Sequence, residues 1–221
     1  FFNLNDSEIL NYYNKKFYYQ EINEWFSSKG DLTYSLNHNL NENSIVIDIG
    51  AYKGLWAEQI YNKFKCNLYL AEPIKDFYNI LEQKFYNNNK IFYKNIGLSN
   101  KNSFINIDKN SINNDSTKLI NSNSQNTYLV ELMTLERFLL MYNLKKVDLI
   151  QINIEGAEYD LLDNWIETDI INSINIIQIQ FHNFDEIKNH TIRREIIRNK
   201  LKNRGFKLKY CFNWVWECYT K

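Results

Sequence analysis

The fold class of this chain is predicted most clearly by the stretch Ser44-Ile45-Val46-Ile47-Asp48-Ile49-Gly50-Ala51-Tyr52-Lys53-Gly54. Its first half is a short apolar run, which is typical of a buried parallel strand. Gly50 and Gly54 let the backbone turn sharply and approach a ligand, and helical spacing follows from Leu55 to Phe64. The stretch therefore predicts a strand, a tight turn and a helix whose N-terminal N–H groups face the turn.

Strands and helices alternate after that stretch. Apolar runs predict further strands at residues 67–71, 91–93, 128–132, 147–154 and 174–181. Helical spacing predicts helices at residues 74–85, 135–142, 156–165 and 192–203. This alternation indicates a mostly parallel α/β sheet. Two alternating runs, 206–211 and 214–218, follow and predict an antiparallel hairpin.

The segments on either side of the glycine turn are less regular. Residues 6–28 carry apolar side chains at near-helical spacing and predict one or two helices that end near Gly30. The polar stretch 31–43 is interpreted as a connection, so we divide the chain into an N-terminal helical extension, 1–43, and a Rossmann-like domain, 44–221. Within that domain, the Asn- and Ser-rich stretch 97–125 is either a surface loop with a short hairpin around its small apolar island or a lid over a substrate.

Composition narrows the classes of partner. The 221 residues include 26 basic and 26 acidic side chains, so the formal net charge is zero and the chain lacks the footprint of a nucleic-acid binder. No window approaches eighteen uninterrupted apolar residues, so we expect no membrane span. Three cysteines without metal-type spacing favour a reducing cytoplasm over a disulfide framework. We see no basic-then-apolar leader, and because the first residue is Phe1, we expect the chain to be a piece of a longer one.

The glycine turn is the strongest candidate for a ligand site. It lacks both the six-residue glycine pattern of dinucleotide binders and the phosphate cradle of nucleotide hydrolases. An aspartate before the turn would repel a phosphate but can accept a hydrogen bond from an ammonium group, whereas a helix N-terminus suits a carboxylate. The amino-acid end of S-adenosylmethionine has both groups; the alternative is a tight turn that binds nothing. We assign cofactor contacts to Asp48, Gly50, Ala51, Tyr52 and Gly54.

Two further strand ends complete the predicted cofactor site. Glu72 closes the second strand about twenty residues after the turn, where an acid can accept hydrogen bonds from both ribose hydroxyls, and Pro73 fixes the turn that follows. The alternative for Glu72 is a solvated acid at a strand end. Asn95 and Ile96 would reach the adenine, with an amide for the ring edge and an apolar flank for its face, although a strand-end Asn is also common in turns.

Four segments together carry a resemblance to a known family: Asp48-Ile49-Gly50-Ala51-Tyr52-Lys53-Gly54, Glu72-Pro73, Thr134-Leu135-Glu136 and Val147-Asp148-Leu149-Ile150-Gln151-Ile152-Asn153-Ile154-Glu155-Gly156-Ala157-Glu158. They resemble the FkbM family of S-adenosylmethionine-dependent methyltransferases, from about residue 44 to residue 182. The Glu-Gly-Ala-Glu stretch is the specific part. The resemblance implies the seven-stranded Rossmann-like sheet of a class I methyltransferase. It also implies O-methylation, commonly of a sugar hydroxyl, with a nucleotide sugar or a surface-polysaccharide precursor as the acceptor.

One further motif and three departures bear on this resemblance. The segment Asn114-Asp115-Ser116-Thr117 is similar to the family's small-residue and serine motif, which implies that the loop around Ser116 covers the acceptor. Gln151 and Asn153 stand where the family usually has Lys and Asp, and Glu136 stands in place of Asp. Losing the acid at position 153 removes a charge from the carboxyl edge of the sheet. Asn153 can still hydrogen-bond the cofactor's amino-acid end or the acceptor hydroxyl.

His182 is the candidate general base. It follows the strand at 174–181, at the edge where ligands bind in open α/β sheets. Its unperturbed pKa lies close to neutral pH, and a sugar hydroxyl is a weak nucleophile that benefits from a base. The alternative is a structural histidine that caps the strand end. His38 and His190 lie in polar, loop-like contexts and receive no role.

Glu155 and Glu158 lie three residues apart at a helix start, so they share a face. Acids there also favour the helix N-terminus, which is the structural alternative. The functional interpretation is that Glu155 hydrogen-bonds the acceptor or orients His182, and that Glu158 contacts the substrate. A divalent metal held by Glu155 with Asp148 is a weaker interpretation because no dense acid cluster supports it, and we assign no metal.

The sequence leaves two rival functions open. One is a methyltransferase for a different acceptor, such as a lipid, a small metabolite or a protein side chain. The other is a catalytically degenerate module that binds the cofactor, or nothing, and serves as an interaction domain; Gln151 and Asn153 keep this possibility open. The sequence does not fix the oligomeric state, and a homo-oligomer is compatible with it.

Overall fold

A computed structural model describes residues 18–109, 126–183 and 189–221 of the chain. Its central sheet has seven strands in the order β3 (Ile91–Lys94), β2 (Asn67–Ala71), β1 (Ile45–Ile49), β7 (Val147–Ile152), β8 (Ile174–Ile179), β10 (Trp216–Thr220) and β9 (Lys207–Phe212). The strands from β3 to β8 run parallel, whereas β10 pairs antiparallel with both β8 and β9. The predicted mostly parallel sheet with an antiparallel C-terminal hairpin is confirmed.

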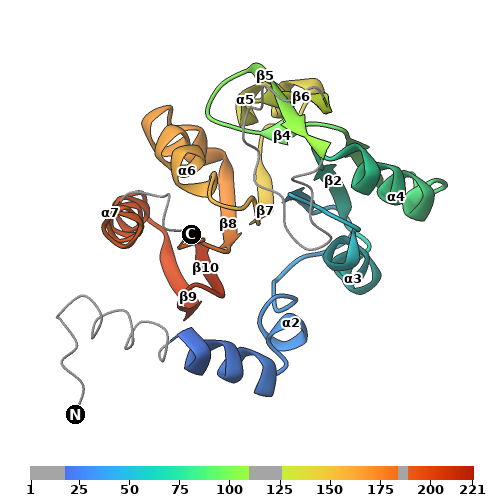
Figure 1. The fold of residues 1–221 in the computed structure, drawn as a ribbon. Helices are drawn as coiled ribbons and strands as arrows, with labels where there is room; N and C mark the ends of the chain where they lie inside the picture. The colour runs from blue at the N-terminus through green and yellow to red at the C-terminus, as the bar shows by residue number, and fades with distance from the viewer. Residues whose placement is uncertain (1–17, 110–125, 184–188) are drawn as a thin grey trace, which may run out of the picture.

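Helices cover both faces of this sheet (Figure 1). On one face lie α3 (Leu55–Phe64) and α4 (Lys75–Phe85), whose buried side chains share a cluster with Val46. On the other lie α5 (Leu135–Met141), α6 (Glu158–Glu167) and α7 (His190–Asn203), whose buried side chains share a cluster with Ile47. A short 3-10 turn, Ile170–Ser173, leads into β8. Because neighbouring residues of a strand face opposite ways, a strand covered on both faces must be mostly apolar, as β1 is apart from Asp48.

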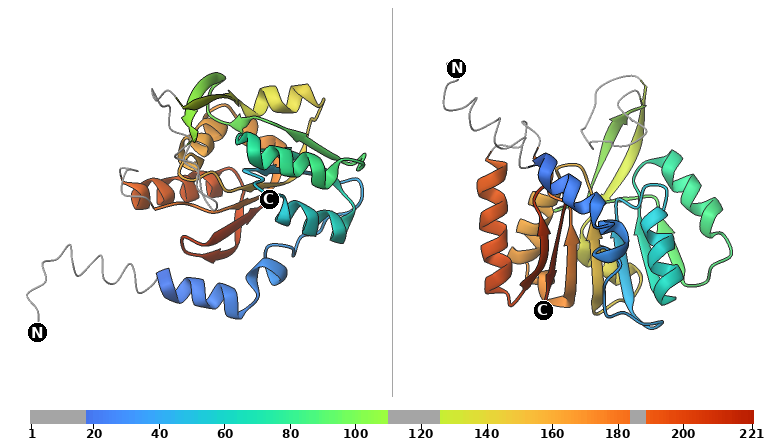
Figure 2. Two further views of the ribbon diagram at one scale, coloured as in Figure 1. Left: turned by 45° about the vertical axis from the view of Figure 1, so that its right-hand side comes forward. Right: turned by 90° about the horizontal axis from the view of Figure 1, so that it is seen from below.

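A second, three-stranded sheet stands beside the main one (Figure 2). It consists of β4 (Gly97–Leu98), β6 (Thr127–Met133) and β5 (Ser103–Asp108), with β5 and β6 antiparallel. Part of the predicted surface loop 97–125 is therefore strand, because Ile107 packs in a buried cluster with Ile74 and Phe77 of the main domain. The remainder, including the proposed lid residue Ser116, lies outside the described residues.

The N-terminal segment packs on the C-terminal hairpin. Residues 18–27 are helical, as predicted, and a second helix, α2 (Gly30–Thr33), begins at Gly30, where we expected the helices to end. Trp25 belongs to a buried cluster with Tyr210 and Phe212 of the hairpin. The expected polar connection 31–43 is not uniformly exposed, since His38 is only 7% exposed. Within the three described ranges, no helix combines the length and apolar character needed to cross a bilayer.

Candidate functional site

A crevice opens where the strand order reverses. From β1 the chain moves outward to β2 and β3, whereas β7 and β8 lie on the other side of β1. Ligands of open α/β sheets bind outside the carboxyl ends of the strands at such a point. A cavity lies here, and its walls include Gly50, Tyr52, Glu72, Asn153 and Glu155. Residues from three separate sequence motifs therefore meet in one cavity.

Gly50 allows two loops to touch at the floor of this cavity. Its φ is +81°, a left-handed conformation that side chains rarely adopt. A Cβ at this position would overlap the main-chain oxygen of Asn153 in the loop after β7. The turn is held to β2 because the N–H groups of Gly50 and Ala51 both donate to the main-chain oxygen of Ala71. Glycine is thus required here by backbone conformation and by close approach together.

Gly50→Ala is expected to lower the free energy of unfolding by at least about 2 kcal/mol, because strain adds to the overlap with the loop after β7. Gly205→Ala is the matched control: Gly205 has φ +87°, and an added Cβ meets nothing within 4 Å. This control isolates the backbone strain, which costs about 1–2 kcal/mol. Chemical denaturation of both variants measures the difference. Equal losses would show that the close approach of the two loops has no energetic weight.

The turn leads into α3 without a side-chain cap. Gly54 is the N-cap residue, with φ 72°, and no side chain accepts from the first turn. The first N–H groups of a helix carry partial positive charge and attract carboxylates. This end of α3 is able to attract the carboxylate of an amino-acid group, but neither Gly54 nor Ala51 lines the cavity, so their cofactor contacts stay predictions.

Glu72 reaches from the end of β2 under the glycine turn. One carboxylate oxygen accepts from the N–H of Tyr52 and the other from the N–H of Ile74, both at 2.8 Å. These bonds orient the carboxylate and leave each oxygen with a lone pair for a further donor. The side chain is 4% exposed, and this burial raises its pKa to about 7. The geometry suits a carboxylate that accepts two hydroxyl hydrogen bonds from a ligand in the cavity.

The Asp48 side chain lies beneath the cavity wall, whereas we predicted that it contacts the ligand. Its side chain is 1% exposed and is not part of the cavity wall. Gln151 Nε2 donates to its Oδ1 at 3.3 Å. Burial raises the pKa of Asp48 to about 7, against the lowering effect of the Gln151 hydrogen bond and with a further increase from Glu72. A direct contact between Asp48 and an ammonium group remains a prediction. The structure places this carboxylate beneath the glycine turn.

Asn95 and Ile96 are occupied within the protein. The Asn95 amide donates to the main-chain oxygens of Glu72 and Pro73, both at 2.9 Å, so it fixes the turn after β2. Ile96 is fully buried in the core. Neither lines this cavity, whereas Asn95 borders a second hollow that shares Phe77 with it, so the adenine contacts stay a prediction.

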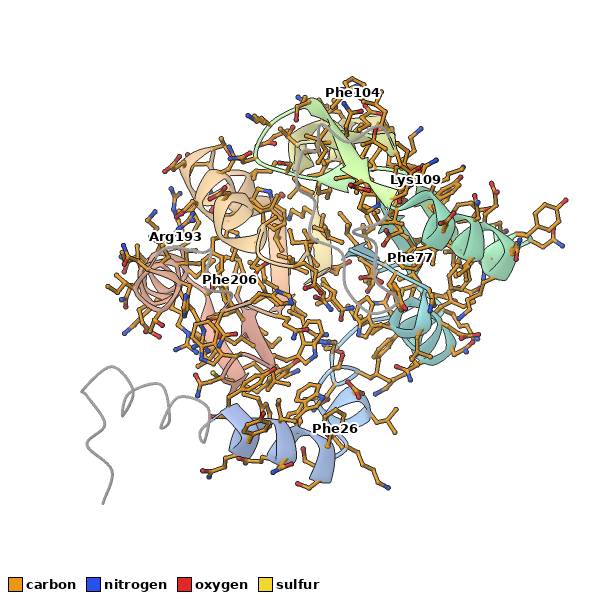
Figure 3. The ribbon with its side chains drawn as sticks, viewed as in Figure 1. Phe26, Phe77, Phe104, Lys109, Arg193 and Phe206 are labelled. Atoms are coloured by element: carbon orange, nitrogen blue, oxygen red, sulfur yellow. The ribbon has the colours of Figure 1, made fainter. Side chains whose placement is uncertain are left out.

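Three residues of the cavity wall were missed by the sequence analysis. Phe77 of α4, with Gly97 and Leu98 of β4, lines the cavity. The Phe77 ring makes an edge contact with Tyr52, with 4.5 Å between the centroids. It also lines the second hollow, which Lys109, the residue after β5, borders; both residues are labelled in Figure 3. The apolar spacing within residues 74–85 predicted that Phe77 is buried. It did not predict that this side chain would line a cavity.

Asn153 offers an acceptor that the protein leaves unused. It lines the cavity at the end of β7, and its Oδ1 is buried without a hydrogen-bond partner in the described part of the chain. A buried, unpaired amide oxygen costs about 1–3 kcal/mol. A ligand that brings an N–H donor to this point, such as an ammonium group, would recover that loss.

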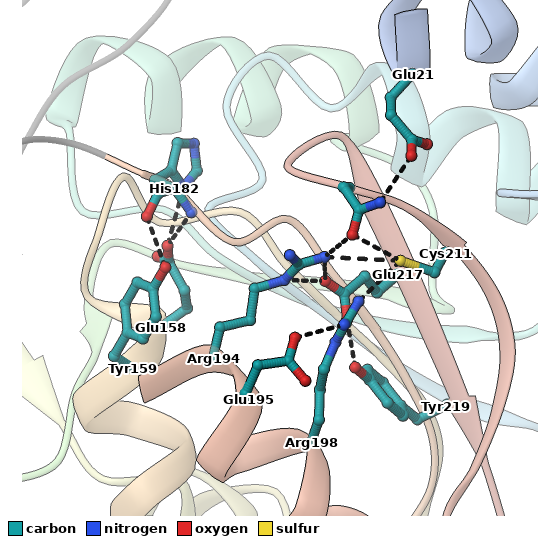
Figure 4. A network of polar contacts seen from close by, with 11 residues as sticks. Glu21, Glu158, Tyr159, His182, Arg194, Glu195, Arg198, Cys211, Glu217 and Tyr219 are labelled. Carbon is teal, nitrogen blue, oxygen red and sulfur yellow. Dashed lines mark hydrogen bonds and ion pairs between the residues drawn. The ribbon is translucent and has the colours of Figure 1, made fainter. Parts of the chain in front are cut away.

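His182 lies within 3.5 Å of two acids, Glu155 and Glu158, the second of which is drawn in Figure 4. Its Nδ1 lies 3.1 Å from Glu158 Oε1, which also accepts from the His182 main-chain N–H at 2.6 Å. Its Nε2 lies 3.5 Å from Glu155 Oε2. Tyr159 donates its hydroxyl to the His182 main-chain oxygen at 2.8 Å. The ring is therefore held in one orientation, with its Nδ1–H toward Glu158.

Glu158 does not lie where a substrate could touch it. Its side chain is fully buried, and its second oxygen accepts from the Gly156 N–H at 2.8 Å. The predicted substrate contact is replaced by an orienting role beneath His182. Glu155 takes a left-handed backbone conformation, φ 54°, and lines the cavity. Asp148 accepts from the Ile45 N–H near the start of β7, at the opposite end from Glu155, so these two acids cannot share a metal.

Comparison with known proteins identifies relatives of this fold. The family model described as the methyltransferase FkbM domain matches residues 48–208. The methyltransferase FkbM from Methylobacillus flagellatus KT is 12% identical, with a TM-score of 0.57 over 86% of this chain and 46% of that one. TrmK of M. capricolum in complex with S-adenosyl-homocysteine is 14% identical, with a TM-score of 0.46 over 86% of this chain and 67% of that one.

The chain thus spans less than half the length of the FkbM structure that it resembles. No protein of curated function matches the chain. The structural likeness shows a class I methyltransferase fold. Because the family model covers the glycine turn, Glu72 and the loop after β7 in one match, the chain belongs to the FkbM family of methyltransferases.

Proposed function

We propose that this protein is an S-adenosylmethionine-dependent O-methyltransferase that acts on a sugar hydroxyl, in a nucleotide sugar or a surface-polysaccharide precursor. One observation carries the cofactor assignment: the cavity at the strand-order reversal holds both an oriented, buried Glu72 carboxylate and an unpaired Asn153 oxygen. These two acceptors suit the ribose hydroxyls and the ammonium group of one ligand. The sugar acceptor follows from the family resemblance.

The residues present fit this cofactor. Glu72 would accept from the ribose hydroxyls, Asn153 would accept from the ammonium group, and the uncapped N-terminus of α3 would receive the carboxylate. Phe77 and Leu98 give an apolar wall for the adenine. When bound, S-adenosylmethionine supplies an activated methyl group on a sulfonium, so the protein mainly supplies alignment and a base.

His182 is the proposed base. Because its Nδ1–H donates to Glu158, the neutral ring has its lone pair on Nε2, which can take the proton of an acceptor hydroxyl. Glu155 lies next to Nε2, where its charge would stabilise the imidazolium formed. Glu158 plays the same stabilising part at Nδ1. The base is thus held between two carboxylates, at the edge of the cavity that Glu155 lines.

Labelled S-adenosylmethionine tests the activity directly. The protein is incubated with a panel of nucleotide sugars, lipids and peptides, and products are read by mass spectrometry. Methylation of a sugar hydroxyl supports the proposal, and methylation of a lipid or peptide replaces the acceptor class. Binding of S-adenosylhomocysteine without transfer to any acceptor would favour the cofactor-binding interaction domain, which the amide at Asn153 makes the second candidate.

Glu72→Ala is expected to weaken binding of S-adenosylhomocysteine by at least about 100-fold, because two charge-assisted hydrogen bonds to the ribose are lost. Glu72→Gln keeps an acceptor oxygen and is expected to lose less. Calorimetry measures both affinities, and circular dichroism checks that each variant is folded, since Glu72 also holds two main-chain N–H groups. Wild-type affinity in folded Glu72→Ala would remove the cofactor assignment.

A further inference from the structure

A chain of hydrogen bonds lies buried across the sheet, on the face that carries Asp48. Gln178 of β8 is its centre, where Nε2 donates to Gln151 Oε1 at 2.6 Å and to Ser35 Oγ at 2.8 Å. Gln151 of β7 then donates from its own Nε2 to Asp48. The strand register places Gln151 opposite both Asp48 and Gln178. The chain therefore ends on the carboxylate directly beneath the glycine turn.

The N-terminal segment fixes the other end. His38 Nε2 lies 3.0 Å from the main-chain oxygen of Ser35 and 3.0 Å from Gln178 Oε1. A main-chain oxygen can only accept, so Nε2 carries a hydrogen. Burial lowers the pKa of His38 to about 4, against the Gln178 hydrogen bond and with a further decrease from the charges of Lys209 and Lys63. The ring is therefore neutral near pH 7, with its one proton on Nε2.

Because the His38 proton is on Nε2, the orientations of the Gln178 and Gln151 side-chain amides are determined. Gln178 must turn its oxygen toward Nε2–H, so its NH₂ faces Gln151. Gln151 must then turn its oxygen toward that NH₂, so its own NH₂ faces Asp48. Reversed amides would set N–H against N–H at His38 and a carbonyl oxygen against the carboxylate. The Ser35 main-chain oxygen thus determines that Asp48 receives a hydrogen-bond donor.

We propose that His38, Gln178 and Gln151 are positioning residues that favour the ionised form of Asp48, and so favour binding of the cationic cofactor in the crevice above. The inference rests on the proposed function, because it concerns the same crevice. Glu72 is the charged group that acts on Asp48, and its negative charge opposes ionisation. The hydrogen bond from Gln151 lowers the pKa of Asp48, whereas the Glu72 charge and burial raise it. The orientation of the Gln151 amide therefore decides what fraction of Asp48 is ionised near neutral pH.

The test measures affinity for S-adenosylmethionine against pH in four variants. Gln151→Leu removes the donor and is expected to move the pH midpoint of binding upward by about one unit, whereas Gln151→Lys adds a cation and moves it downward by about one unit or more. His38→Phe frees the amides to reverse and moves the midpoint upward. Glu72 titrates in the same range, so differences between variants, rather than the midpoint itself, report on Asp48.

Tyr210→Phe is the matched control. The Tyr210 hydroxyl donates to Gln178 Oε1 at 2.8 Å, but a hydroxyl can rotate to donate or accept, so it does not fix the amide direction. We expect the midpoint of this variant to equal that of wild type. A shift as large as that of His38→Phe, or no shift in Gln151→Leu, would overturn the inference.

Thermal unfolding without cofactor separates this inference from the proposed function. A carboxyl whose folded pKa is raised contributes stability at low pH that is lost as pH rises through about 7. Asp48→Asn removes this contribution to the free energy of unfolding. Gln151→Leu should raise the pKa of Asp48 further, so the contribution should be lost at a higher pH than in wild type. If wild type binds no S-adenosylmethionine, the proposed function fails, yet these profiles still decide the orientation of the chain: an unchanged profile in Gln151→Leu overturns it.

Discussion

Replacing His182 by alanine is expected to reduce methyl transfer by about two to four orders of magnitude, which is the usual contribution of a positioned general base. Glu158 is a poor substitute for the imidazole, because it is fully buried and already accepts from three N–H groups. Affinity for S-adenosylhomocysteine should be unchanged, since His182 is not part of the wall of the cavity that we propose as the cofactor site. Single-turnover rates with the acceptor found in the labelling panel measure the effect.

His190→Ala is the matched control for that variant. It makes the same chemical change at a histidine whose ring packs on Trp214, with 5.4 Å between the centroids, away from the crevice. Glu158→Gln tests the orienting role, because it keeps the shape but removes the charge at Nδ1. We expect a lower rate and a shifted pH–rate profile in that variant. A wild-type rate in His182→Ala would leave the histidine as a structural cap of the strand end.

The sequence predicted the parts of the site that follow from strand order. Neighbouring parallel strands end at the same edge, so the turn after β1 and the acid after β2 had to meet, and the register pairs Ile49 with Ala71 just before them. The same argument brought His182 near the loop after β7. It could not distinguish Glu155 from Glu158 as the residue beneath His182, because that depends on the left-handed turn at Glu155.

Contacts between distant segments were beyond the sequence argument. The stretch 31–43 reads as a polar connection, yet His38 contacts Gln178, 140 positions away, because the hairpin and the N-terminal helix together cover this part of the sheet. Likewise, nothing local shows that the apolar side chains of β5 pack on Phe77 rather than in a free hairpin. Periodicity gives the faces of an element, whereas the partner of each face is decided by packing.

Glu217→Ala is expected to lower the free energy of unfolding by about 3–5 kcal/mol, because it leaves a buried cation without its partner. Glu217 of β10 is 1% exposed and Arg194 of α7 is 4% exposed, and the two form an ion pair (Figure 4). Arg198 Nε also donates to Glu217, at 3.0 Å, and Tyr219 donates its hydroxyl to it. One carboxylate thus joins α7 to the C-terminal hairpin.

Two further variants show whether that loss comes from the unpaired charge. Glu58→Ala removes a surface ion pair, with Lys84 at 3.1 Å, and should cost at most about 1 kcal/mol. The double variant Arg194→Met/Glu217→Leu removes both buried charges and should recover most of the stability lost in Glu217→Ala, because a well-packed apolar pair can replace a buried ion pair. Denaturation curves measure all three. If the double variant were as unstable as Glu217→Ala, the stability lost in Glu217→Ala would come from the ion pair itself and not from the cost of an unpaired, buried arginine.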